Sequence, residues 1–143
     1  MPEGNFEVLM VGSTERFYKL RHNILHADLI VAQGSWQLAT HYLQTYPVAI
    51  NTIATFERVD LVLVYNDLGL SPKWLQKFCK ELAAVLAAHP NKPAVGLDRA
   101  VMVGEAEEAI EKIFRKAGVS VSYGDIGDIF HAVIRSKAIR ALN

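Results

Sequence analysis

The sequence lacks the features that mark secreted and membrane-spanning proteins. Its single cysteine, Cys79, has no partner for a disulfide within the chain, and its place in a run of helix formers favours a small buried apolar group in a reducing compartment. The first residues have no basic start followed by an apolar run, and no segment approaches the roughly 20 apolar residues that span a bilayer. We therefore expect a cytoplasmic protein with no membrane partner.

An excess of charge of one sign is missing too. Lysine and arginine number 15, aspartate and glutamate also number 15, and the formal net charge is zero. Attraction between basic residues and phosphates supplies most of the affinity of proteins for nucleic acids. Because this chain has no excess of basic residues, we expect no nucleic-acid partner. What is present is ordinary globular material, 51% hydrophobic over 143 residues, which is enough for one core. We expect a single domain over residues 1–143.

Short apolar runs alternate with amphipathic stretches along this chain. The runs that predict parallel strands are residues 6–11, 27–32, 60–65, 94–97 and 119–123. The stretches with helical spacing are residues 13–26, 35–46, 71–89, 104–117 and 125 onwards. An extra segment at about 47–59 is interpreted as helical, although residues 48–50 could equally form a short strand. Five such alternations predict an α/β protein with a doubly wound, five-stranded parallel sheet.

In such a sheet a ligand site lies outside the carboxyl ends of the strands. The polar and aromatic residues that follow the predicted strands are therefore candidates for a strand-end pocket. They are Ser13, Tyr65, Asn66, Asp67, Asp98 and Asp125. Converging carboxylates suit general acid and base chemistry, but aspartates at these places also cap helices and form turns.

Four stretches of the chain together match a family pattern. They are Ala32-Gln33-Gly34-Ser35 with Leu38-Ala39, Val59 to Tyr65, Lys92 to Asp98, and Ala117-Gly118-Val119 followed by a strand and a terminal helix. In this order they resemble the receiver domains of two-component signalling over nearly the whole chain. The resemblance implies a flavodoxin-like, receiver-like three-layer sandwich.

The positions that perform receiver chemistry differ in this sequence. Phosphoryl transfer from a donor histidine needs an aspartate nucleophile, two acids that hold Mg²⁺, a hydroxyl and a lysine. At the matching places stand Tyr65 for the nucleophile, Gly12 and Ser13 for the acid pair, Asp98 for the hydroxyl, and Tyr123 with Gly124 for the lysine and its proline. A neutral phenol does not replace a carboxylate. The resemblance therefore implies a degenerate receiver that lacks the phosphoacceptor aspartate.

This interpretation implies a signalling or protein-interaction module that works without phosphorylation and without a cofactor. Its protein partner cannot be named from the sequence. Receivers usually bind partners on the face formed by the fourth helix, the fifth strand and the last helix, which makes Tyr123, Arg135 and Arg140 candidate contact residues. Arginines on a terminal helix are also commonly just solvated.

A small nucleoside- or nucleotide-processing enzyme is the alternative. Lys92 to Leu97 also resembles the strand that follows the catalytic segment of nucleoside deoxyribosyltransferases, and Glu81 stands near the place of their upstream glutamate. The glycine-threonine of that family is replaced by Ser71-Pro72-Lys73, which argues against nucleoside binding. Gly12-Ser13-Thr14 could bind a phosphate on backbone amides, but it lacks both the repeated glycines of a dinucleotide loop and the lysine of a P-loop.

Histidines and aromatic residues leave two further questions open. His22 and His26 form the one i,i+4 histidine pair, and without an acid or cysteine nearby we expect no metal site. Several aromatic residues concentrate around the second predicted helix, namely Trp36, Tyr42, Tyr46, Phe56 and Trp74. These residues either pack in the core or form an exposed surface, and exposure would favour a symmetric homo-oligomer.

Overall fold

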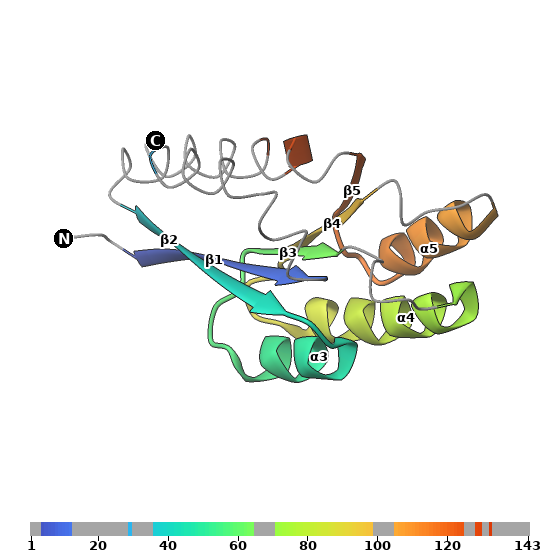
Figure 1. Cartoon of the computed structure of the whole chain (residues 1–143), viewed down its shortest axis with the longest axis horizontal. Coiled ribbons are helices and arrows are strands. Elements are labelled where there is room, and N and C mark those ends of the chain that lie inside the picture. Colours follow the sequence, from blue (N-terminus) through green and yellow to red (C-terminus); the bar gives the residue numbers. More distant parts are fainter. Residues whose placement is uncertain are drawn as a thin grey trace.

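The computed structural model describes residues 4–12, 29, 36–64, 71–98, 105–124, 128–129 and 132. Its five strands are β1 (Gly4–Val11), β2 (Trp36–Leu43), β3 (Leu61–Val64), β4 (Ala94–Asp98) and β5 (Val121–Gly124). They form one parallel sheet in the order β2-β1-β3-β4-β5 (Figure 1). This is the flavodoxin-like order, and it confirms the predicted five-stranded parallel α/β fold.

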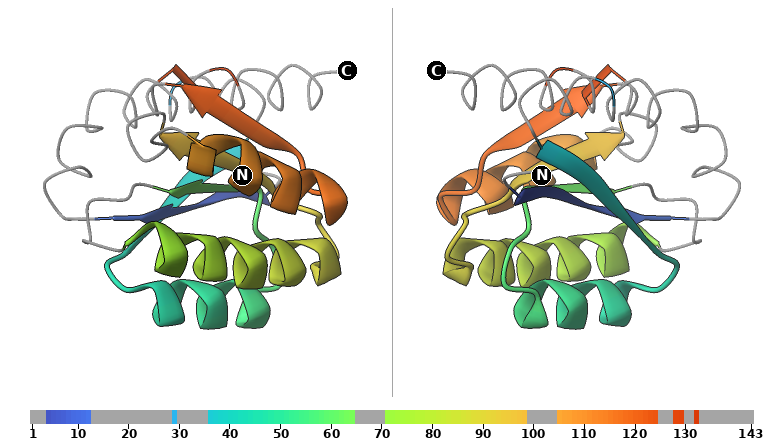
Figure 2. Two further views of the ribbon diagram at one scale, coloured as in Figure 1. Left: turned by 90° about the vertical axis from the view of Figure 1, so that its right-hand side faces the viewer. Right: turned by 90° about the vertical axis from the view of Figure 1, so that its left-hand side faces the viewer.

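Three helices in the described part of the chain pack against one side of the sheet. They are α3 (Tyr46–Thr55), α4 (Pro72–Ala88) and α5 (Glu105–Lys116). Figure 2 shows α3 and α4 side by side in a layer below the sheet. Alternate strand residues such as Leu9, Val62 and Leu97 form one buried cluster with helix residues such as Ile53 and Phe114. Among the described residues, no helix is both long and apolar enough to cross a membrane.

The opposite side of the sheet is packed at Gly96. A Cβ atom added there would lie 2.8 Å from Ile129 Cγ2 and 2.8 Å from Leu63 Cδ2. Ile129 is buried. The missing side chain of Gly96 therefore lets Ile129 approach the sheet closely.

Helix α4 agrees closely with the sequence prediction. Its N-cap is Ser71, whose Oγ accepts a hydrogen bond of 3.4 Å from the backbone N–H of Trp74, and Pro72 begins the helix. Apolar residues at helical spacing in this stretch are buried, including Leu75 and Leu82. Cys79 is fully buried, as expected, and burial raises the pKa of its thiol from 9.0 to about 12.

The second strand does not lie where the sequence placed it. Residues 27–32 were expected to form this strand; of that range the structure describes Leu29 alone, which is helical and exposed. The strand is instead Trp36–Leu43, a stretch predicted to be helical. Trp36, Ala39 and Leu43 match helical spacing by coincidence. The β-forming side chains of Thr40 and Tyr42 favour a strand, and pairing along the whole of β1 stabilises it.

The segment at 47–59 was expected to be an extra segment, but with β2 at residues 36–43 it forms a regular part of the fold. Residues 46–55 form helix α3, so the helical interpretation describes this stretch correctly. Because β2 precedes it directly, α3 is the regular crossover from β2 to β3 and not an addition to the fold. Pro47 lies in its first turn, where a missing backbone N–H costs nothing.

Candidate interaction surface

The predicted strand-end pocket lies mostly outside the described residues. This applies to Ser13, Tyr65, Asn66, Asp67 and Asp125, and also to the contact candidates Arg135 and Arg140. Asp98 is described: it is the last residue of β4, partly buried, and lies opposite Gly124 of β5.

Tyr123 was a candidate for an outward contact face. It is half-buried, and its ring packs against the hydrophobic cluster on the helix-covered side of the sheet. Its hydroxyl oxygen is buried. Little of the side chain is therefore available for contact with another protein.

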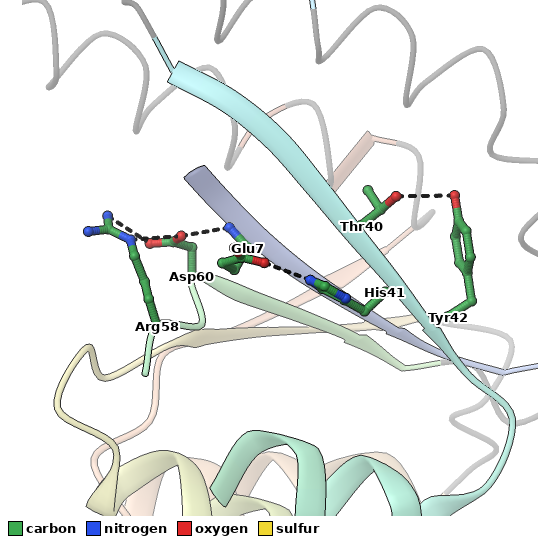
Figure 3. Close-up of polar contacts among 6 residues, drawn as sticks. All are labelled: Glu7, Thr40, His41, Tyr42, Arg58 and Asp60. Carbon is green, nitrogen blue, oxygen red and sulfur yellow. Dashed lines mark hydrogen bonds and ion pairs between the residues drawn. The ribbon is translucent and has the colours of Figure 1, made fainter. Parts of the chain in front are cut away.

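A polar cluster occupies the opposite, amino end of the sheet (Figure 3). Asp60 is buried there, and its Oδ2 accepts hydrogen bonds from the backbone N–H of Glu7 at 2.8 Å and from Nε of Arg58 at 3.2 Å. Arg58 Nη2 lies 3.1 Å from Asp60 Oδ1, so the guanidinium binds both carboxylate oxygens. These contacts hold the start of β3 against β1.

Glu7 and His41 form a second pair in this cluster. Glu7 Oε2 and His41 Nε2 lie 2.6 Å apart, and the imidazole makes an edge contact with the Phe56 ring, centroid to centroid 4.9 Å. A carboxylate and an imidazole at this distance can hold or transfer a proton. However, neither residue lines either of the two cavities of this structure that we describe. Both lie within their strands, whereas such sheets bind ligands beyond the carboxyl ends of the strands. We interpret the pair as a link between β1 and β2.

His89 is a buried histidine with a structural role. Its Nε2 donates to the carbonyl oxygen of Phe56 at 2.9 Å, and its Nδ1 accepts from the backbone N–H of Asn91 at 3.1 Å. Both ring nitrogens of the neutral imidazole are therefore satisfied. Within the described residues, no group of three or more histidines, cysteines or carboxylates is arranged to hold a metal ion.

A groove of about 330 Å³ separates α3 from α4 on the outer side of the helical layer. Its lining residues are Tyr46, Pro47, Trp74, Lys77, Phe78 and Glu81. Tyr46 and Phe78 are buried, and their ring centroids lie 4.3 Å apart. They form an aromatic floor, whereas the other four residues are exposed.

Trp74 is the most unusual residue of this groove. It is 56% exposed, although an indole gains much free energy from burial. The Nζ of Lys77, one turn further along α4, lies 4.8 Å from the centroid of the indole ring. A cation at this distance holds the ring in place at the surface. Trp74 is thus an aromatic side chain that contacts a cation and leaves more than half of its surface open to solvent.

Helix α3 extends this exposed apolar surface. Its sequence, YPVAINTIAT, contains no charged residue, and Val48 is 51% exposed. Pro47, Asn51 and Ala54 are also exposed. An outer helix of a monomer normally presents charged side chains to water. We call the outward side of α3 together with the exposed groove residues Trp74, Lys77 and Glu81 the α3–α4 surface.

A smaller cavity of about 230 Å³ lies between the end of α4 and the end of α5. Its described lining residues are mostly apolar, including Ala87, Pro93 and Gly118, and Lys92 is the one charged residue among them. These residues offer neither an aromatic anchor nor converging polar groups, so the α3–α4 surface is the stronger candidate.

Comparisons with known proteins bear on the fold alone. No protein-family model matches the chain, and no curated protein matches it significantly. The structure of S. aureus homoserine dehydrogenase at pH 6.0 aligns with 10% identity and a TM-score of 0.52, covering 84% of this chain and 32% of that one. The pH 7.0 structure aligns with 11% identity, a TM-score of 0.51, and 83% and 32% coverage. The chain thus spans about a third of that enzyme's length.

A third alignment covers both chains completely. It is with a short-chain flavodoxin associated with a PDU bacterial microcompartment, at 11% identity and a TM-score of 0.47. That score is too low to support an argument about function. The strand order itself establishes the flavodoxin-like fold, which is compatible with a receiver-like domain.

The sequence indicated part of the α3–α4 surface. The aromatic concentration around residues 36–74 included Tyr46 and Trp74, and both line the groove. Tyr42 is 47% exposed but lies on the other side of the sheet, because it neighbours His41 on a strand and His41 faces Phe56. A further signal in the sequence is the absence of charged residues from the stretch that forms α3.

Proposed function

We propose that this chain is a protein-interaction module with a receiver-like fold, that it works without phosphorylation, and that the α3–α4 surface is where it binds protein. The exposure of Trp74 beside the uncharged helix α3 is the observation on which this proposal depends. Tryptophan and tyrosine are the side chains that most often dominate binding energy at protein interfaces. A large exposed apolar surface on a folded domain commonly marks a binding site.

The residues beside the strands support the proposal that the chain works without phosphorylation. Tyr65 comes directly after β3, where a receiver has its aspartate nucleophile. The buried aspartate of this region, Asp60, precedes β3, at the amino end of the sheet, and is bonded to Arg58 and to the backbone of Glu7. It is therefore at the wrong end of the strand to act as a phosphoacceptor.

Photo-crosslinking at position 74 tests the proposal. Replacing Trp74 with the photoreactive amino acid p-benzoylphenylalanine keeps an aromatic group on the surface, and irradiation in extracts of the source cells should produce covalent protein adducts. Lys112, exposed on α5 and outside the surface, is the matched control position. We expect adducts from position 74 and few from position 112. Equal labelling from both positions would contradict the proposal.

Treatment with acetyl phosphate and Mg²⁺ tests the claim that the chain works without phosphorylation. We expect no acid-stable, base-labile acyl phosphate on the chain.

The position of Glu81 does not support the enzymatic alternative. Glu81 lies on the outer side of α4 and not beside the strand ends. A thermal shift with nucleosides that Asp67→Ala abolishes would nevertheless favour the enzyme over the module.

A further inference from the structure

The exposed side of α4 has a regular pattern of side-chain size and charge. Trp74, Lys77, Glu81, Ala84 and Ala88 are all exposed and follow one another at intervals of three or four residues. Residues at these intervals lie on one side of a helix. They form one stripe, which we call the α4 stripe, running from a large aromatic residue through a cation and an anion to two small residues.

We propose that the α3–α4 surface binds a second copy of this chain, with the two α4 helices antiparallel around a twofold axis at the level of Cys79. Such an axis exchanges positions 77 and 81 and also positions 74 and 84. Lys77 of each copy then faces Glu81 of the other, and the Trp74 indole packs on the small Ala84 of the other. The inference rests on the proposed function, whose surface it adopts.

We infer a second copy as the binding partner because the α4 stripe is complementary to itself. In a twofold interface each contact occurs twice, so a surface must contain its own partner groups. The α4 stripe contains both members of an opposite-charge pair and both members of a large and small pair. Ala84, which this axis places opposite Trp74, is exposed and small, so it leaves room for an incoming indole.

The charges around the stripe are compatible with this arrangement. The same rotation places α3 of one copy beside α3 of the other, and α3 contains no charged residue to repel its copy. The formal net charge of the chain is zero, so two copies do not repel each other overall. Lys73 and Lys80 are also exposed on α4 and lie three or four residues from Lys77 and Ala84, so they border the stripe, although they do not line the groove; exposed charges in water contribute little.

Charge exchange tests the pairing of Lys77 with Glu81. Lys77→Glu places two glutamates at each former pair, and Glu81→Lys places two lysines there. We expect each single variant to weaken dimerisation at least tenfold in sedimentation velocity over a concentration series. The double variant Lys77→Glu/Glu81→Lys restores opposite charges, and we expect it to return within about fivefold of the original, because the contact of Lys77 with the Trp74 ring is lost.

Two controls keep the test decisive. Lys112→Glu makes the same change in net charge outside the surface and should leave dimerisation unchanged. Thermal unfolding by circular dichroism checks that each variant is folded; all the substituted side chains are exposed, so we expect unaltered melting. A second pair of variants, Trp74→Ala and Ala84→Trp, should each weaken the dimer, the latter by filling the space opposite the indole.

The possible failures are distinguishable. A wild-type chain that stays monomeric up to millimolar concentration would overturn the second-copy inference, whereas adducts with other proteins from position 74 would still support the proposed function. A dimer that neither single charge variant weakens, or that the double variant does not restore, would overturn the antiparallel pairing. An absence of any adduct from position 74 would overturn both.

Discussion

Asp60 is a buried carboxylate whose hydrogen-bond partners are brought together by the fold. It accepts hydrogen bonds from the Glu7 backbone and from Arg58 while lying almost completely out of water. A buried carboxylate is tolerated only when it has such partners. The sequence predicted a strand that begins at Asp60, whereas β3 begins at Leu61, and the partners of Asp60 could not be predicted, because Glu7 is 53 residues away.

Substituting Asp60 should therefore affect stability more than substituting a surface carboxylate. We expect Asp60→Ala to lower the free energy of unfolding by about 2 kcal/mol, since the backbone N–H of Glu7 and the Arg58 guanidinium lose a charged acceptor. Asp60→Asn, which keeps one acceptor oxygen, should cost less. Urea unfolding measures both values.

Glu111→Ala on α5 is the matched control. Glu111 pairs with Arg115 one turn away, and that arginine is largely exposed, so the loss should be below about 0.5 kcal/mol. Equal effects at positions 60 and 111 would mean that Asp60 is not buried as described.

At the scale of elements, the packing of Ile129 against Gly96 of β4 leaves no room for a larger side chain at position 96. A methyl group at position 96 meets Ile129 and Leu63 at 2.8 Å, so we expect Gly96→Ala to destabilise the fold by about 1–3 kcal/mol through overpacking. Ile129→Ala removes one of the two clashing groups. In a double-mutant cycle measured by urea unfolding, the double variant should therefore be more stable than the sum of the single effects indicates.

Strict additivity in that cycle would contradict the packing of Ile129 on the sheet. The same cycle run with Ile113→Ala provides a control, because Ile113 lies in α5 and contacts the cluster on the other side of the sheet. That pair should be additive.

Elements with strong local signals were predictable, and the one with weak signals was not. Helix α4 has a serine cap, a first-turn proline and a continuous apolar stripe, each readable within a few residues. β2 has none of these signals. It borders the sheet and has half-buried residues on both faces, so clear alternation is missing, and its strand form depends on pairing with β1. Local spacing alone then favoured a helix.

The candidate surface was predictable only in part for a related reason. The sequence shows that aromatic residues concentrate before and within α3 and α4, but burial decides their roles: Tyr46 is buried in the groove floor, whereas Trp74 is exposed. The Glu7–His41 pair was missed altogether, because it depends on β1 and β2 being neighbours in the sheet. Contacts between distant segments need the topology before they can be inferred.

At the scale of the whole molecule, the chain combines a common fold with an uncommon exterior. The flavodoxin-like sheet supports many unrelated functions, so the fold does not decide between a module and an enzyme. The exterior favours the module, because an exposed tryptophan, an uncharged outer helix and a self-complementary stripe lie together on α3 and α4. We therefore propose that binding takes place on the helical layer and not at the ends of the strands.

NMR spectra of the ¹⁵N-labelled chain over a dilution series test that assignment most directly, because each backbone amide reports its own surroundings. We expect concentration-dependent shifts to concentrate in α3 and along Trp74, Lys77, Glu81 and Ala84 of α4, while Lys112 and its neighbours on α5 stay constant. Shifts confined to Asp98, Gly124 and the other strand ends would contradict the assignment of binding to the helical layer, and spectra that do not change with concentration would contradict the binding of a second copy.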